Sequence, residues 1–401
     1  MQPNPTANQT KIHVGLEIGT SKICFVVGEV KAGSAIKILG ISVTETAGVN
    51  EGEIYDSALA RACLKDALAK AEDASDVKIG SVYLAVTGAH IQGVNSRGIY
   101  HLPEGEPKVT HEHVEEACSI AREVRIPQDH VYLHPIIRNC WVDGVEYSSA
   151  PVSLIGKTVE SDFHIVHGIG NRIQESIHLV RSMELEVDDI VFSPIAVAQM
   201  AADREQRERG ALVIDIGGGT TDYALYLNGV IAASGCIPLG GDHVTNDIHL
   251  VTGLPISKAE RLKVIEGDAS VSPEKSVGAI KLTEKVGEVE VEVERSILNQ
   301  TIRQRLEEIL QSVRSRLPDR ALESIGAGVI VTGGTSLLQG FSELAFDVFG
   351  REIHRPAPPK FSGIQANFDD PRYATAIGLI RYAQIIEAER AGESSLPLSQ
   401  G

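Results

Sequence analysis

The stretch IDIGGGTTD at residues 214–222 decides the fold of this 401-residue chain. Apolar runs flank it, so the sequence predicts a strand over 211–216, a turn over 217–222 and a returning strand over 223–227. The same unit occurs near the N-terminus, where LEIGTSK at 16–22 lies between two apolar runs. Its acid, Glu17, precedes the matching Asp215 by 198 residues, about half the chain. A unit that recurs at this separation predicts two related α/β domains that face each other.

Both turns have the composition of a polyphosphate site. Glycine lets the backbone approach the phosphates, and successive N–H groups form a nest for an anion. Glu17 and Asp215 cannot bind phosphate because they are anionic, but they suit the water shell of Mg²⁺, which takes few protein carboxylates. The alternative is a pair of tight β-hairpins with glycine at positive φ. Acid and threonine at matching offsets in both turns favour the phosphate site.

Other nucleotide-binding signatures are missing from the sequence. No GxxxxGK[ST] occurs, which excludes a P-loop, and no GxGxxG follows a predicted strand, so a Rossmann site has no support.

The composition narrows the class of protein. Lys and Arg total 37 against 54 Asp and Glu, a formal net charge of −17, which argues against nucleic-acid binding and against unaided adsorption to anionic lipid. No stretch approaches the roughly 20 apolar residues of a membrane helix, and residues 1–13 lack the features of a signal peptide. Five cysteines without a CxxC predict free thiols. We expect an acidic cytoplasmic protein with aliphatic cores, because only 4% of its residues are aromatic.

Hydrophobic periodicity and capping residues predict the remaining elements. These are a helix after Asp56, a strand at 81–87, an inserted subdomain of short strands at 88–166 with a helix opened by Thr110, helical structure at 178–200 around Pro194, a charged connector at 204–209, a helix at 257–264, a strand at 284–294, an amphipathic helix at 302–317, and a strand at 327–332 followed by a helix from Ser336.

Several motifs resemble those of the actin, Hsp70 and sugar-kinase superfamily. IDIGGGTTD and LEIGTSK resemble its two phosphate loops, and VTGG at 331–334 resembles its adenosine loop. AERLK at 259–263 is similar to the Glu-x-x-Lys pair that clasps the nucleoside, and IPLGGDHVTNDI at 237–248 resembles the segment after the second phosphate loop.

Within the superfamily, the chain most resembles the FtsA family of bacterial cell-division proteins. The resemblance runs from about residue 12 to 385. Six segments carry it in the expected order: GLEIGTSKI, SVYLAVTGAHI, VTHEHVEEA, VIDIGGGTTDYALY, VTGGTSLLQG and PRYATAIGLIRYA.

The resemblance implies an α/β, actin-like (ribonuclease H-like) fold, in which duplicated domains surround a nucleotide cleft and carry an FtsA-type inserted subdomain. The implied boundaries are a disordered tail at 1–11, subdomain 1A at 12–87 and 167–206, subdomain 1C at 88–166, subdomain 2A at 207–250 and 301–355, subdomain 2B at 251–300, a return to 1A at 356–386, and a disordered tail at 387–401.

The resemblance also implies ATP and Mg²⁺ as ligands, with Glu17 and Asp215 acting on the ion through water and serving as the candidate catalytic residues. The implied nucleotide-binding residues are Gly19, Thr20, Ser21, Lys22, Gly217, Gly218, Gly219, Thr220, Thr221, Gly241, Glu260, Lys263, Gly333 and Gly334. Lys22 can instead be an exposed turn residue. Relatives that hydrolyse ATP carry a carboxylate or amide before the proline of the central helix, and Ser193 occupies that position here. We therefore expect slow turnover at most, with nucleotide acting mainly as an assembly ligand.

The resemblance implies several partners. They are the C-terminal tail of FtsZ, other copies of the chain in filaments, and divisome membrane proteins, at the cytoplasmic face of the cell membrane at the division site. Arg295, Arg303 and Arg305 are candidates for binding the acidic, apolar tail, or belong to a solvated helix face.

The family's C-terminal amphipathic membrane helix has no counterpart here. After Arg381 the only basic residue is Arg390, among three glutamates. Either the chain is truncated or a partner provides attachment. The main alternative is a PilM-type scaffold of a pilus or secretion system, which shares this fold without a membrane helix. A small-molecule kinase is a third reading, weakened by the lack of an evident aspartate base.

Overall fold

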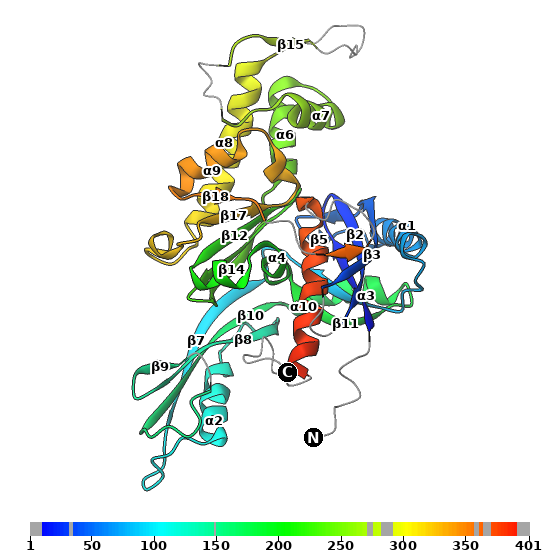
Figure 1. The fold of residues 1–401 in the computed structure, drawn as a ribbon. Coiled ribbons are helices and arrows are strands. Elements are labelled where there is room, and N and C mark those ends of the chain that lie inside the picture. The colour runs from blue at the N-terminus through cyan, green and yellow to red at the C-terminus, as the bar shows by residue number, and fades with distance from the viewer. Residues whose placement is uncertain are drawn as a thin grey trace.

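The computed structural model describes residues 10–31, 35–147, 150–270, 276–281, 292–356, 361–363 and 370–390. Its strands form two large sheets, one in each half of the molecule, with helices packed on them (Figure 1). None of the helices in these ranges is long and apolar enough to cross a membrane.

The first half is built on a six-stranded sheet in the order β11-β6-β1-β2-β3-β19. The strands are β1 (Lys11–Ile18), β2 (Lys22–Val30), β3 (Lys37–Glu45), β6 (Ser81–Val86), β11 (Glu186–Phe192) and β19 (Ser362–Gly363). Helices α1 (Ser57–Ser75) and α10 (Ala374–Arg390) cover opposite faces, since Gly40 of β3 meets Ser75 and Gly28 of β2 meets Ile380. The hairpin β4 (Val49–Asn50) and β5 (Glu53–Ile54) and helices α3 (Gly170–Arg181) and α4 (Ser193–Ala201) complete this half.

The second half is built on a nine-stranded sheet in the order β18-β17-β12-β13-β14-β7-β10-β8-β9. Five of its strands come from the second half: β12 (Ala211–Ile216), β13 (Thr221–Leu227), β14 (Val230–Ile237), β17 (Val329–Thr332) and β18 (Ile353–His354). Its helices are α5 (Arg204–Glu208), α6 (Gly241–Thr252), α7 (Ile256–Glu266), α8 (Arg295–Arg314) and α9 (Phe341–Phe349), beside the small pair β15 (Ala279–Lys281) and β16 (Glu292–Glu294).

The other four strands belong to the insertion, which has a core of its own around helix α2 (His111–Arg122). They are β7 (Gln92–His101), β8 (His130–Val142), β9 (Val145–Tyr147) and β10 (Thr158–Ile169). The prediction of short strands here was wrong, because β7, β8 and β10 are 10, 13 and 12 residues long.

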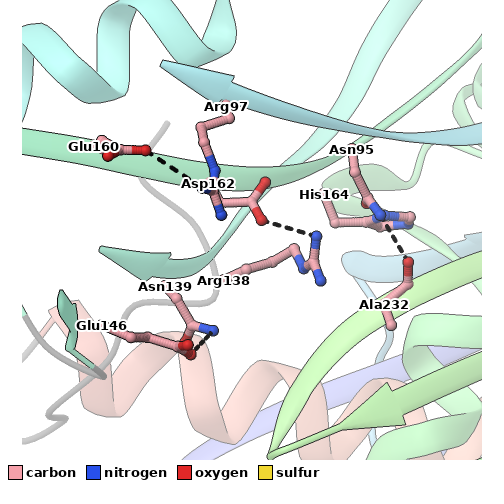
Figure 2. A network of polar contacts seen from close by, with 9 residues as sticks. All are labelled: Asn95, Arg97, Arg138, Asn139, Glu146, Glu160, Asp162, His164 and Ala232. Carbon is pink, nitrogen blue, oxygen red and sulfur yellow. Dashed lines mark hydrogen bonds and ion pairs between the residues drawn. The ribbon is translucent and has the colours of Figure 1, made fainter. Parts of the chain in front are cut away.

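Polar side chains join the insertion to the second half. Strand β7 pairs with β14 only at Gln92 and Gly235, but His164 lies between Asn95 Oδ1 at 2.6 Å and Ser234 Oγ at 2.8 Å. Burial lowers the pKa of His164 to about 3, so the ring bridges the two strands as a neutral group. Figure 2 shows further pairs around it: Arg97 with Glu160 at 3.3 Å, Arg138 with Asp162 at 3.0 Å, Asn139 with Glu146 at 2.6 Å, and Asn95 Nδ2 with the carbonyl of Ala232 at 2.9 Å.

Local capping chemistry explains where two helices begin. The side chain of Asp56 accepts hydrogen bonds from the N–H groups of Ala58 and Leu59, both at 3.0 Å, as predicted for the start of α1. Thr110 accepts from the N–H of His113 at 3.3 Å and begins α2, also as predicted.

Other element predictions need correction. The stretch 178–200 is not one helix, because α3 ends at Arg181 and the β-branched residues before Phe192 pair with β6 as strand β11. Pro194 lies in the first turn of α4, where its missing N–H costs no hydrogen bond. The connector at 204–209 is the short helix α5, and the segment from Ser336 belongs to a 3₁₀ turn, Gly334–Leu337, before α9. Helix α8 begins seven residues before the predicted start, and of the strand predicted at 284–294 only 292–294 lie within the described residues.

Both predicted tails also overlap regular structure. Lys11 is the first residue of β1, and α10 continues through 387–390, where Glu387 accepts a hydrogen bond from Lys11 Nζ at 2.7 Å.

Candidate nucleotide site

The two glycine-rich turns meet at the interface between the halves. A Cβ atom added at Gly219 would lie 2.8 Å from the Cβ atom of Thr20, and one at Gly218 would lie 3.0 Å from the Cβ atom of Ser21. The turns share one geometry, since Gly19 N donates to Lys22 O and Gly217 N donates to Thr220 O, both at 2.9 Å. The duplicated motif therefore forms two opposed hairpin turns in direct contact.

A cavity of about 340 Å³ lies over these turns. Nearly all the predicted site residues line it: Glu17, Gly19, Thr20, Ser21, Lys22, Asp215, Gly217, Gly218, Gly219, Thr220, Gly241, Glu260, Lys263, Gly333 and Gly334. Thr221 does not line it, because it is the first residue of β13 and its fully buried hydroxyl donates to Leu239 O at 2.8 Å.

Three neighbouring carboxylates, those of Glu17, Asp215 and Asp222, line the cavity. Burial and the nearby Glu17 raise the pKa of Asp215 to about 7, and Asp215 Oδ2 accepts from Thr375 Oγ1 at 3.1 Å. Burial also raises the pKa of Asp222 to about 7, although Thr87 Oγ1 donates to its Oδ1 at 2.6 Å. Buried acids with raised pKa values favour a bound cation.

Lys22 is held within the same group of acids. Its ammonium lies 2.7 Å from Glu17 Oε2, and both side chains are less than one-fifth exposed. No three His, Cys, Asp or Glu side chains in the described ranges converge closely enough to ligate a metal directly. Glu17 and Asp215 both line the cavity, and their chemistry fits a magnesium ion that keeps its water shell, because Mg²⁺ takes few protein carboxylates.

The Glu-x-x-Lys pair forms another wall. Lys263 is 5% exposed, and its Nζ donates to Gly241 O at 2.9 Å and Thr245 Oγ1 at 2.8 Å, with Glu260 Oε2 at 2.6 Å. Beside this pair the cavity is lined by the apolar residues Val264, Leu337 and Leu338. A polar clasp next to apolar side chains suits a nucleoside.

Gly333 occupies a position that only glycine fits. Its φ is +85°, and an added Cβ would lie 2.6 Å from the backbone N of Ile216. The VTGG loop therefore packs directly against the strand that carries Asp215.

Ser193, the first residue of α4, also lines the cavity. It is 4% exposed, and its hydroxyl donates to Val86 O at 3.2 Å. The hydroxyl is therefore held by the backbone of the first half.

Sequence reasoning missed several lining residues. They are Thr87, Asp222, Asp242, Thr335, Arg372 and Thr375. All six stand inside segments that resemble the family, so their positions were available as a signal. Their place at the cavity was not evident from the sequence, because only the fold brings these distant segments together.

The three candidate tail-binding arginines on α8 do not line this cavity, and each is already paired. Arg295 binds Glu266 of α7 at 2.6 Å, Arg303 binds Asp347 of α9 at 2.9 Å, and Arg305 binds Asp247 of α6 at 2.6 Å. They point to three different elements and do not form one cluster.

Comparisons with known proteins agree with the motifs. The family model "Cell division protein FtsA" matches residues 212–378, and the model "SHS2 domain inserted in FTSA" matches residues 88–167. The cell division protein FtsA of Borreliella burgdorferi is 32% identical over 371 residues, covering 92% of this chain and 90% of the relative. That of Escherichia coli K12 is 31% identical over 398 residues, covering 97% and 94%.

Solved structures confirm the predicted fold class. A PilM–PilN type IV pilus biogenesis complex matches with a TM-score of 0.64 at 20% identity, covering 93% of this chain and 98% of that chain. MreB5 of Spiroplasma citri bound to ADP matches with a TM-score of 0.57 at 15% identity, covering 95% and 98%. That MreB5 structure holds an adenine nucleotide. With about 31% identity along almost its whole length and the inserted SHS2 domain, the chain belongs to the FtsA family of actin-like cell division proteins.

Proposed function

We propose that this protein binds ATP with Mg²⁺ in the cavity between its halves and uses the nucleotide to control assembly at the division site. The observation that carries the proposal is the contact of the two matching glycine turns beneath the cavity, with acids below and the Lys263 clasp beside them.

The charge of the cavity supports a metal–nucleotide complex over a free nucleotide. Five acids line it (Glu17, Asp215, Asp222, Asp242 and Glu260) against three cations (Lys22, Lys263 and Arg372). A triphosphate alone would add further negative charge, whereas Mg²⁺ would offset it and interact with Glu17 and Asp215 through its waters.

Turnover should be slow. A serine hydroxyl at position 193 is short, and the backbone of Val86 already accepts its hydrogen bond. It is poorly suited to orient an attacking water, so the nucleotide serves mainly as a conformational ligand.

The assembly function extends this proposal. Filaments of the chain would link the FtsZ ring to the cytoplasmic membrane and to divisome membrane proteins. The FtsZ tail would bind near the start of α8, where Ile297 is 43% exposed and an acidic peptide could compete with Glu266 for Arg295. The PilM-type alternative is disfavoured, because identity to FtsA relatives is about 31% whereas identity to the PilM structure is 20%.

Calorimetric titration with ATP tests the nucleotide proposal. Binding should require Mg²⁺ and should weaken at least tenfold in Asp215→Asn. Magnesium-independent binding, or equal binding by the variant, would contradict the assignment of the acids.

Electron microscopy tests the assembly proposal. Filaments should form with ATP, and a fluorescent FtsZ-tail peptide should bind the wild type and bind less well to Arg295→Glu. Binding of a membrane-protein N-terminal peptide in place of the tail, without filaments, would favour the scaffold reading.

A further inference from the structure

Two arginines that form no ion pair with a described carboxylate, Arg207 and Arg381, lie on helices that contact α4. Helices α4 and α10 both begin at the cavity, where Ser193 and Thr375 line it. They touch three residues later, since a Cβ atom at Gly378 would lie 2.5 Å from the carbonyl carbon of Ala196. One turn further along, α4 carries Gln199 and α10 carries Arg381.

Arg207 on the neighbouring helix α5 completes the group. Its Nη1 donates to Gln199 Oε1 at 2.7 Å, and its guanidinium lies 5.7 Å from the ring centroid of Tyr226. The guanidinium of Arg381 lies 5.3 Å from the ring centroid of Phe361. Burial and, to a smaller extent, the positive charge of Arg207 lower the pKa of Arg381.

Two hydrogen-bond donors in this group have no acceptor among the described residues. They are Nε2 of Gln199, a residue that is 5% exposed, and Nε of Arg381, and both atoms are buried. The amide orientation of Gln199 is fixed, because its oxygen accepts from Arg207. Among the described residues no carboxylate forms an ion pair with Arg207 or Arg381, although the chain has 54 acids and only 37 lysines and arginines.

We propose that Gln199, Arg207 and Arg381 form a binding site for a dianionic phosphate group, separate from the nucleotide cavity. A dianion neutralises both guanidinium charges, whereas one carboxylate would leave a positive charge uncompensated. Its several oxygens also accept hydrogen bonds from the buried amide and guanidinium N–H groups.

Phosphate binding at this site should stabilise the folded protein, because of where the site lies in the chain. Helix α5 lies in the segment that leads from the first half to the second, and α10 returns the chain to the first half. A phosphate held by α4, α5 and α10 would link the two connections, so it should raise the unfolding temperature of the protein.

Phosphate titration of the full chain tests the site. Inorganic phosphate is added at constant ionic strength, with Mg²⁺ and saturating AMPPNP to occupy the nucleotide cavity, and the unfolding temperature and heat of binding are recorded. The wild type should show a saturable rise in unfolding temperature. Arg381→Gln and Arg207→Gln should each weaken phosphate binding at least tenfold.

Arg204→Gln is the matched control, because Arg204 lies on α5 like Arg207 but already pairs with Glu208 at 2.7 Å. It makes the same charge change and should bind phosphate like the wild type. If Arg381→Gln fails to fold, Arg381→Lys keeps the charge and should bind with intermediate affinity, and Arg207→Gln on the surface helix remains informative.

A parallel titration with glycerol 3-phosphate identifies the source of the phosphate group. Arginine-dependent binding of both molecules indicates a phosphomonoester ligand, and binding of inorganic phosphate alone indicates the free ion. No binding by the wild type, or equal binding by the Arg207, Arg381 and Arg204 variants, would overturn the assignment. Magnesium-dependent nucleotide binding is measured separately, so a failure here leaves the proposed function standing.

Discussion

Replacing Asp222 with Asn should make the nucleotide-free protein more stable at pH 8 and should leave its stability at pH 4 nearly unchanged. Asp222 is 6% exposed, and Thr87 Oγ1 donates a hydrogen bond to its Oδ1 at 2.6 Å. Burial, with a smaller contribution from the neighbouring Asp215, raises its pKa to about 7. The amide of Asn can still accept from Thr87 but carries no charge.

The raised pKa sets the direction and the size of the effect. Between about pH 4 and 7 the unfolded chain has lost this proton and the folded chain retains it, so stability falls as the pH rises. The difference between the ordinary value of 3.8 and about 7 is worth roughly 4 kcal/mol, at about 1.4 kcal/mol per tenfold change. At pH 8 the variant should therefore be more stable than the wild type by up to about 4 kcal/mol.

Urea unfolding between pH 4 and 8, without nucleotide or Mg²⁺, measures the difference. The quantity to compare is the difference in unfolding free energy between the wild type and Asp222→Asn at each pH, because every other titrating group contributes to both proteins. Asp319→Asn, at an exposed loop residue, is the control and should track the wild type at each pH. Parallel stability curves for the wild type and Asp222→Asn would refute the reasoning, since they would mean that Asp222 ionises in the folded state as readily as in the unfolded chain.

Three further predictions concern the nucleotide site. Lys263→Met should abolish measurable ATP binding and lower the free energy of unfolding by about 2–4 kcal/mol, because the buried oxygens that accept hydrogen bonds from Nζ lose their partner. Unchanged ATP binding in calorimetry would show that Lys263 does not contribute to the nucleotide site. The rate of ATP turnover should be far below the enzyme median of about 10 s⁻¹. Ser193→Gln should raise this rate several-fold, whereas Ser193→Ala should not. A wild-type rate near that median in a phosphate-release assay would show that a serine at position 193 does not slow hydrolysis. Gly219→Ala should weaken ATP binding and lower the free energy of unfolding by about 1–3 kcal/mol, because the added Cβ atom would overlap Thr20. Gly80→Ala is the control and should behave as the wild type, because a Cβ atom at Gly80 meets nothing within 4 Å. Equal unfolding free energies for the two variants would contradict the close contact of the turns.

The glycine turns were predictable from the sequence because their chemistry is local. The acid, the glycines and the hydroxyls stand within a few residues of one another, and the strands that present them are short apolar runs. The same holds for the helix caps at Asp56 and Thr110, which act over three residues.

Errors arose where a distant partner decides the structure. Residues 186–192 became a strand because β6 offers a parallel edge, which periodicity alone cannot reveal. The arginines of α8 looked like a cluster along the chain, but α6, α7 and α9 each supply an acid to one of them. The long strands of the insertion likewise depend on one another, since β10 pairs with β7 and β8 along nearly its whole length.

The sequence by itself determined the two phosphate-loop motifs, the family and most of the residues that line the cavity, because these depend on residue types at fixed short spacings. Only the tertiary structure decided which groups lose water and which find partners. It buried Asp222 against Thr87, added Arg372 and Thr375 to the cavity, and placed Gln199, Arg207 and Arg381 on three helices in contact, where no described carboxylate forms an ion pair with either arginine. Burial and pairing depend on segments far apart in the chain, and they set the charge of each site.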